Sequence, residues 1–184
     1  MHLVLDLDET LISVSLKPVS NPDFTFIINS VPYYGRKRPG LDLFLKFAFS
    51  HFDTISVWTA ATRSYAIKVI KNIMTETQYS ALAFFKTRVD LVSSQGSYYK
   101  PLSKIFTTTE AKKYKITPKN TIMIDDRADV LRNNPGNGIM IPPWKGVQGD
   151  MYLCKLIIVL NGVLENNILF GDFGQVIDLT SIVD

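Results

Sequence analysis

The sequence has few of the residues on which several common kinds of site depend. It contains one cysteine, Cys154, and two histidines, His2 and His51. A single cysteine excludes an intramolecular disulfide and fits a reducing compartment. No apolar run approaches the roughly 20 residues that a helix needs to cross a bilayer, and no signal-peptide pattern is visible. We therefore expect an intracellular protein, nuclear or cytoplasmic, that does not enter a membrane.

The sequence also lacks a large excess of charge of either sign. The net formal charge is +3 and no block of five like charges occurs, so the composition does not favour a nucleic-acid partner. We interpret the one basic cluster, Arg36–Arg38, as a solvated strand end. The length of 184 residues and the 46 % apolar share predict a single domain over residues 1–184. The oligomeric state is not indicated.

Short apolar runs alternate with segments of helical periodicity. Continuous Val/Ile/Leu runs are typical of strands buried on both faces, and they occur at Leu3–Leu5, Thr54–Trp58, Thr121–Ile124 and Gly138–Ile141. Apolar residues at helical spacing predict helices over residues 38–52, 62–74, 103–114 and 150–165. The alternation predicts an α/β fold with a doubly wound, mostly parallel sheet.

Two segments interrupt that alternation. Residues of about 14–35 contain Phe24–Gly35, which has the pattern of a β-hairpin inserted after the first strand. Residues of about 78–99 contain further strand and loop patterns before the next helix. In open α/β sheets, ligands bind at the carboxyl ends of the strands. We expect both insertions to emerge there and to shape a site.

The first strand ends in two aspartates, within the stretch LVLDLDETLI at residues 3–12. Strand side chains alternate, so Asp6 and Asp8 share a face and their charges repel. Solvent, a cation or another partner must offset that repulsion. Taken alone, the two aspartates are also compatible with turn residues or with a helix cap at Asp8 or Thr10.

Further polar groups lie near the other predicted strands: Thr59 follows Thr54–Trp58, Asp125 and Asp126 follow Thr121–Ile124, and Lys100 lies at the start of the helix that precedes Thr121. Singly, these residues are compatible with a cap, a surface lysine and an exposed loop. Together they form a coherent set for phosphoryl transfer. Asp6 can attack phosphorus, and Asp8 can protonate the leaving oxygen. Several carboxylates suit Mg²⁺, and Thr59 and Lys100 can bind phosphoryl oxygens.

In these motifs the sequence resembles the haloacid dehalogenase superfamily, whose phosphatases carry aspartate–x–aspartate–x–threonine after the first strand. Over residues 3–145 it is more specifically similar to the FCP/SCP-like phosphatases of the RNA polymerase II C-terminal domain, also called nuclear-LIM-interactor-like (NLI-interacting-factor-like) phosphatases. The stretches that carry this resemblance are Ser15–Phe24, Arg36–Leu45, Ser64–Ala66 and Tyr98–Ile105. Asn120–Ile139, with its paired aspartates, resembles the larger and the ubiquitin-like-domain-containing members.

The resemblance implies a Mg²⁺-dependent protein serine/threonine phosphatase without a large cap domain, acting on a phosphoprotein or phosphopeptide, with polymerase C-terminal-domain-like peptides as one possibility. It makes Asp6 the nucleophile and Asp8 the acid/base. It makes Thr59 and Lys100 phosphate ligands. Asp6, the carbonyl of Asp8, and Asp125 or Asp126 would bind the metal. It places Arg88 and Tyr65 against the substrate.

Some features depart from this family or leave alternatives open. The hairpin is about four residues shorter than in the small phosphatases, where it forms a proline pocket; Leu16, Ile28 and Tyr33 are candidates for such a pocket here. The sequence does not decide between an excised domain and a minimal enzyme, and residues 169–184 match no known pattern. A non-catalytic interaction module and a phosphatase for nucleic-acid ends remain alternatives. A cysteine phosphatase is excluded, because Leu160 stands where the arginine would follow Cys154.

Overall fold

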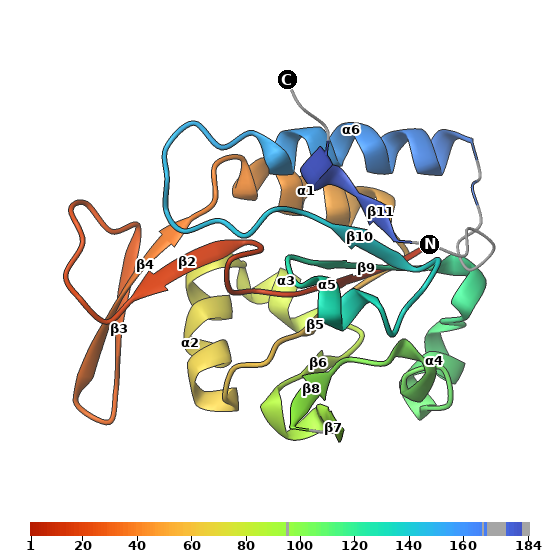
Figure 1. The fold of residues 1–184 in the computed structure, drawn as a ribbon, viewed down its shortest axis with the longest axis horizontal. Coiled ribbons are helices and arrows are strands. Elements are labelled where there is room, and N and C mark those ends of the chain that lie inside the picture. Colours follow the sequence, from red (N-terminus) through yellow and green to blue (C-terminus); the bar gives the residue numbers. More distant parts are fainter. Residues whose placement is uncertain (95, 167, 169–175, 182–184) are drawn as a thin grey trace.

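The computed structural model of the chain describes residues 1–94, 96–166, 168 and 176–181. A six-stranded sheet lies at its centre in the order β11-β10-β9-β1-β5-β6 (Figure 1). Every neighbouring pair in it is parallel, which confirms the predicted fold class. Its strands are β1 (His2–Leu5), β5 (Thr54–Trp58), β6 (Phe85–Lys86), β9 (Thr121–Asp125), β10 (Gly138–Met140) and β11 (Ile177–Asp178). β11 lies in a segment for which the sequence offered no prediction.

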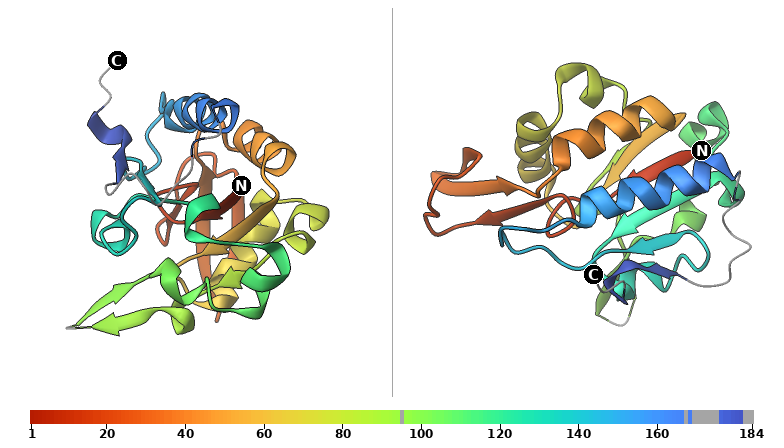
Figure 2. Two further views of the ribbon diagram at one scale, coloured as in Figure 1. Left: turned by 90° about the vertical axis from the view of Figure 1, so that its right-hand side faces the viewer. Right: turned by 90° about the horizontal axis from the view of Figure 1, so that it is seen from above.

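Helices cover both faces of this sheet. One face packs on α1 (Leu41–His51), α2 (Arg63–Ile73) and α6 (Tyr152–Glu165), through strand residues such as Leu3 and Leu5. The opposite face, which includes Val4, packs on α4 (Thr109–Tyr114), α5 (Ala128–Leu131) and a 3-10 turn at Leu102–Lys104. Both views in Figure 2 show α1 and α6 side by side. The alternation of side chains along β1 thus supplies two cores.

Apolar stripes explain three of the four predicted helices. In α1 the buried residues Leu41, Phe44, Leu45 and Ala48 recur at helical spacing. The helix predicted over residues 103–114 is wrong in its first half, because only Thr109–Tyr114 is α-helical. The Thr108 hydroxyl donates to the Ile105 carbonyl at 2.8 Å and accepts from the Ala111 amide at 3.2 Å. It therefore closes one turn and caps the next.

The remaining helical elements are short. They are α3 (Glu76–Ser80) and 3-10 turns at Arg88–Asp90, Pro118–Asn120 and Leu179–Ser181. None of the helices in the described part of the chain is long and apolar enough to cross a membrane. Most of the segment 169–184, which matches no known sequence pattern, lies outside the described residues.

A small antiparallel sheet follows β1 and extends beyond the carboxyl end of the central sheet, at the left of Figure 1. This hairpin sheet contains β2 (Ile12–Ser15), β3 (Phe24–Ile28) and β4 (Val31–Lys37) in the order β2-β4-β3. The turn residues Asn29 and Ser30 both have positive φ, as a two-residue type I′ turn requires. β7 (Val92–Ser94) and β8 (Ser97–Tyr99) form a second hairpin. The hairpin predicted within residues 24–35 is therefore present, as β3 and β4.

The interpretation of Arg36–Arg38 as a solvated strand end is wrong for Arg38. Its side chain is fully buried and its guanidinium lies 2.8 Å from the Asp150 carboxylate. A buried charge needs such a partner. The partner is 112 residues away in sequence, so no local pattern could have indicated it.

Candidate active site

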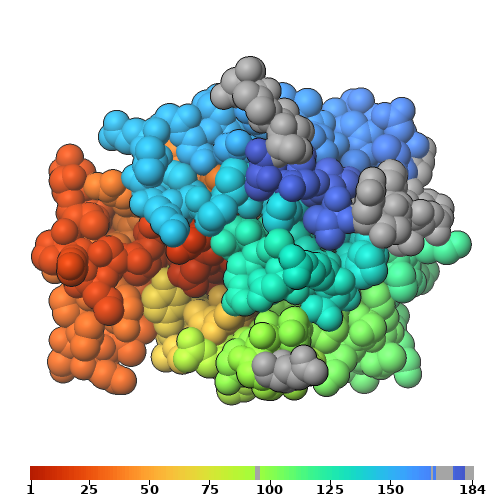
Figure 3. All heavy atoms as spheres, viewed as in Figure 1, coloured from red at the N-terminus to blue at the C-terminus, as the bar shows by residue number. Residues whose placement is uncertain are grey.

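The site is built on the loop that leaves the carboxyl end of β1. The Asp6 amide donates to the Ile124 carbonyl at 3.1 Å, which fixes Asp6 beside β9. The loop then turns back on itself, since the amides of Leu11 and Ile12 both donate to the Leu7 carbonyl. Figure 3 shows this dark red loop at the surface, between the hairpin sheet and the yellow segment around residue 60. Asp6 and Asp8 therefore lie at the carboxyl edge of the central sheet, directly after β1, as expected from the sequence.

Lys100 joins two carboxylates inside this edge. Its ammonium lies 2.5 Å from Asp6 Oδ1 and 2.7 Å from Asp125 Oδ2. All three side chains are buried. Burial by itself would lower the pKa of Lys100, but the two adjacent carboxylates outweigh that effect and raise it. Lys100 is therefore a permanent positive charge at the point where Asp6 and Asp125 meet.

Asp126 completes a cluster of three carboxylates. Asp6, Asp125 and Asp126 each offer an oxygen within 4.8 Å of the others. The second oxygen of Asp125 accepts from the Arg127 amide at 3.0 Å, and Thr10 Oγ1 donates to Asp126 at 3.3 Å. Hard carboxylate oxygens from few residues are the donor set that Mg²⁺ prefers. The residues present therefore fit a magnesium ion. The Asp8 carboxylate is not part of this cluster.

Burial raises the pKa of three carboxyl groups of the site, those of Asp8, Asp125 and Asp126. The pKa of Asp8 is raised to about 6, chiefly because its side chain is desolvated, with a smaller contribution from the nearby Asp6 charge. Burial also raises the pKa of Asp126 to about 6. The pKa of Asp125 is raised by burial and by Asp6. Protonated carboxyl groups are thus accessible near neutral pH, as a general acid requires.

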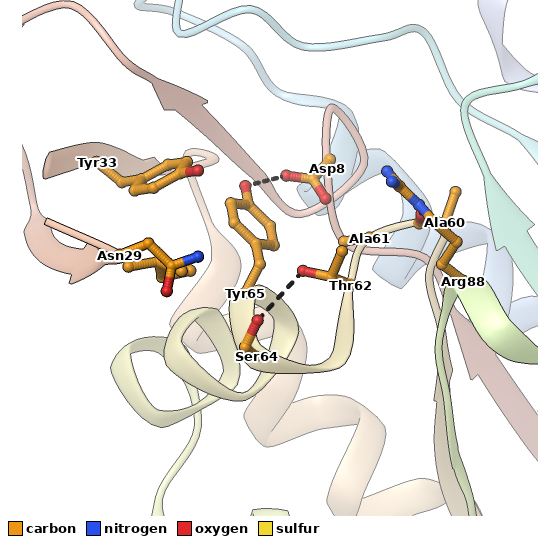
Figure 4. Close-up of a pocket in the computed structure, with 10 residues that line it drawn as sticks. Asp8, Asn29, Tyr33, Ala60, Ala61, Thr62, Ser64, Tyr65 and Arg88 are labelled. Atoms are coloured by element: carbon orange, nitrogen blue, oxygen red, sulfur yellow. Dashed lines mark hydrogen bonds between the residues drawn. The ribbon is translucent and has the colours of Figure 1, made fainter. Parts of the chain in front are cut away.

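An open pocket of about 620 Å³ lies next to Asp8. It is lined by residues of the hairpin sheet, including Ile28 and Tyr33, and by Tyr65 and Arg88 from the other side. Figure 4 shows Asp8 and Tyr65 facing each other, with Tyr33 across from Tyr65. The Tyr65 hydroxyl donates to Asp8 Oδ1. Of the three residues predicted for a proline pocket, Ile28 and Tyr33 line this space, whereas Leu16 is exposed and is absent from the lining.

The other predicted groups lie at the same edge. Thr59 is buried directly after β5, the neighbour of β1, and its hydroxyl accepts from the Ala61 amide at 3.1 Å. Sequence reasoning missed Asn134, which is buried against the backbone of Lys100. Its side chain donates to the Lys100 carbonyl at 2.9 Å and accepts from the Leu102 amide at 2.8 Å. Nothing in the spacing of Asn134 indicates that role.

The chain is similar to a family of known phosphatases. The family model for NLI interacting factor-like phosphatases matches residues 1–168. The chain belongs to this family. This confirms the resemblance that the sequence motifs carried.

Two curated members of the family illustrate the similarity. A probable C-terminal domain small phosphatase of Dictyostelium discoideum is 31% identical over 89% of this chain. The carboxy-terminal domain RNA polymerase II polypeptide A small phosphatase 2 of Mus musculus is 27% identical over 94% of it. The chain spans 50% of the first relative and 61% of the second.

A solved structure shares the family fold. Fcp1, described as an essential RNA polymerase II CTD phosphatase, superposes with a TM-score of 0.57 at 21% identity. The match covers 90% of this chain and 51% of that one. At this identity the likeness concerns the fold. It agrees with the parallel sheet and covering helices found here.

Proposed function

We propose that this protein is a magnesium-dependent protein serine/threonine phosphatase that acts through an aspartyl-phosphate on Asp6. The observation that carries the proposal is the placement of Lys100 between Asp6 and Asp125, beside an open pocket that Asp8 lines. The ammonium holds the Asp6 carboxyl group in one orientation, as a positioned nucleophile requires. Asp8, two residues on, faces the pocket from which a leaving group would depart.

The reaction follows from these positions. Asp6 Oδ attacks phosphorus, the bond from phosphorus to the serine or threonine oxygen breaks, and Asp8 gives its proton to that oxygen. Water then attacks the phosphorus of the aspartyl-phosphate, Asp8 takes the proton from water, and the Asp6 carboxylate is released with inorganic phosphate. The raised pKa of Asp8, about 6, suits a group that both gives and takes a proton.

The remaining groups have supporting roles in this proposal. Lys100 and Thr59 would bind phosphoryl oxygens. Asp6, Asp125 and Asp126, with the carbonyl of Asp8, would hold Mg²⁺, which when bound supplies positive charge beside the phosphoryl oxygens. Since three carboxylates stand around a single ammonium, a further cation at this point is electrostatically favourable.

A phosphopeptide is the substrate that the pocket best fits. The pocket is open and is lined by aromatic and polar side chains, among them Tyr65 and Arg88. A peptide can lie in an open groove, whereas a small metabolite needs enclosure. The Mus musculus and Homo sapiens relatives are named as carboxy-terminal domain RNA polymerase II small phosphatases, so we include peptides of that kind among the substrates.

Hydrolysis of p-nitrophenyl phosphate by the purified protein, with Mg²⁺ and with chelator, tests the chemistry. We expect hydrolysis that depends on Mg²⁺ and that Asp6→Asn abolishes. With a phosphoserine peptide as substrate, Asp8→Asn should slow phosphate release by a factor of about 10² to 10⁴, because the serine alkoxide is a poor leaving group that needs a general acid. A phosphoserine peptide should also be preferred over a 3′-phosphorylated oligonucleotide. Folded wild-type protein that binds phosphopeptide but releases no phosphate would instead support a non-catalytic module.

A further inference from the structure

Arg38 is buried between two segments that are distant from each other in sequence. Its Nε and one terminal nitrogen each lie 2.8 Å from the Asp150 carboxylate, in a bidentate pair. The same terminal nitrogen donates to the Pro142 carbonyl at 2.9 Å. The other donates to the carbonyls of Thr10 at 3.1 Å and Glu9 at 3.3 Å. Arg38 therefore ties the 142–150 segment to the loop that carries Asp6 and Asp8.

One of the loop residues that Arg38 contacts has a strained backbone. Glu9 has a φ of 60°, a left-handed conformation that a non-glycine residue adopts at a cost. Its carbonyl accepts from Arg38 and also from the Trp144 amide, at 2.7 Å. Both donors act on the carbonyl that this conformation directs toward the 142–150 segment. They offset the strain and keep the loop in one shape.

The Thr10 contact reaches the carboxylate cluster. Arg38 binds the Thr10 carbonyl, and the Thr10 hydroxyl donates to Asp126. A buried ion pair is by itself weak evidence for stability, because desolvation of both charges opposes their attraction. The geometry indicates that this one fixes a conformation. Arg38 does not line the pocket, so it would act through the loop.

We propose that Arg38, held by Asp150, is a positioning residue for the reaction: it keeps the Asp6–Ile12 loop in its active shape and holds Thr10 against Asp126. The proposal rests on the proposed function for its kinetic consequence. Its structural consequence, an ordered loop, can be measured without turnover. The two can therefore be tested separately.

Arg36 supplies a matched control. It lies in β4, two residues before Arg38, and also binds the 142–150 segment, through the Gly146 carbonyl at 3.1 Å. Its other bonds go to Ser20; none of its bonds among the described residues reaches the Asp6–Ile12 loop. Arg36→Met thus removes a guanidinium from the same region but leaves that loop's contacts in place.

We would measure kcat, KM and amide hydrogen exchange for wild type, Arg38→Met, Arg38→Lys and Arg36→Met. In Arg38→Met, exchange of the Leu11 and Ile12 amides should rise about tenfold more than that of the central strands. Its kcat should fall about 10²-fold with little change in KM, as expected for a displaced catalytic group. Arg38→Lys should give exchange rates and a kcat between those of wild type and Arg38→Met, because lysine keeps the charge but lacks the bidentate guanidinium.

Loop exchange and kcat in both Arg38 variants equal to those of Arg36→Met would overturn the proposal. If Arg38→Met does not fold, Arg38→Lys and Asp150→Asn decide by the same measurements. A wild-type protein that releases no phosphate would refute the proposed function. The exchange comparison would still decide whether Arg38 orders the loop.

Discussion

Lys100→Met tests most directly how the buried charges of the site are balanced. The substitution keeps a long flexible side chain but removes the ammonium that lies 2.5 Å from Asp6 and 2.7 Å from Asp125. Both carboxylates are then left buried without that cation. Removing one partner from a buried ion pair typically costs about 3–5 kcal/mol, because the remaining charge is uncompensated.

The cost should depend on pH. Without Lys100, an orphaned carboxylate has a folded-state pKa raised above its unfolded value, so stability is greatest below the unfolded pKa and is lost as pH rises through the folded one. Asp125, whose pKa burial and Asp6 already raise, can take up a proton and relieve part of the loss. We therefore expect a deficit of about 3 kcal/mol at about pH 8 and a smaller one at about pH 5.

Urea unfolding in the presence of chelator, at both pH values, measures this directly. Lys104→Met is the control, since Lys104 is exposed and belongs to no ion pair among those in the described part of the chain; it should change stability little. The slope of free energy against urea should stay constant, so that midpoints can be compared. A Lys100→Met protein as stable as wild type at both pH values would refute the charge-balance reasoning.

Three further outcomes are expected. Asn134→Ala, which leaves the buried Lys100 carbonyl and Leu102 amide without their partner, should lower the free energy of unfolding by about 2–3 kcal/mol in urea titrations. Gly35→Ala should destabilise by about 1–3 kcal/mol, because its Cβ would lie 2.1 Å from the Phe24 ring; calorimetry measures this. In chelator, wild-type stability should fall as pH rises from about 4 to about 7, since burial raises the pKa of Asp8 and Asp126; denaturation across that range measures it.

Elements with a periodic pattern were predictable from the sequence. The strands β1, β5 and β9 and the helices α1, α2 and α6 follow apolar spacing closely, because burial on the sheet requires it. The prediction of one helix over residues 103–114 failed because the apolar spacing there is helical, whereas Thr108 forms hydrogen bonds with the local backbone. Local polar competition is weaker as a sequence signal than an apolar stripe.

The site divides in the same way. Groups at the ends of neighbouring parallel strands converge by topology alone, which is why Asp6, Thr59 and the paired aspartates could be placed together. Lys100 follows β8 of the separate two-stranded sheet, so its approach to Asp6 depends on how that hairpin packs. Arg38 and Asn134 could not be assigned from sequence, since their partners depend on how distant loops pack. The family resemblance implies a substrate contact for Tyr65, which stays a prediction, whereas the structure shows its hydroxyl bound to Asp8. That hydrogen bond depends on how α2 packs against the loop.

The balance of charge at the site links the separate groups. When ionised, Asp6, Asp8, Asp125 and Asp126 carry four negative charges around the single ammonium of Lys100. Three uncompensated charges would repel a phosphate dianion. On the proposed function, Mg²⁺ offsets two of them and a proton on Asp8 offsets the third. Burial of Asp8 favours that proton, and the same proton is the one that the leaving oxygen requires. The condition for binding phosphate is therefore also the condition for cleaving its ester.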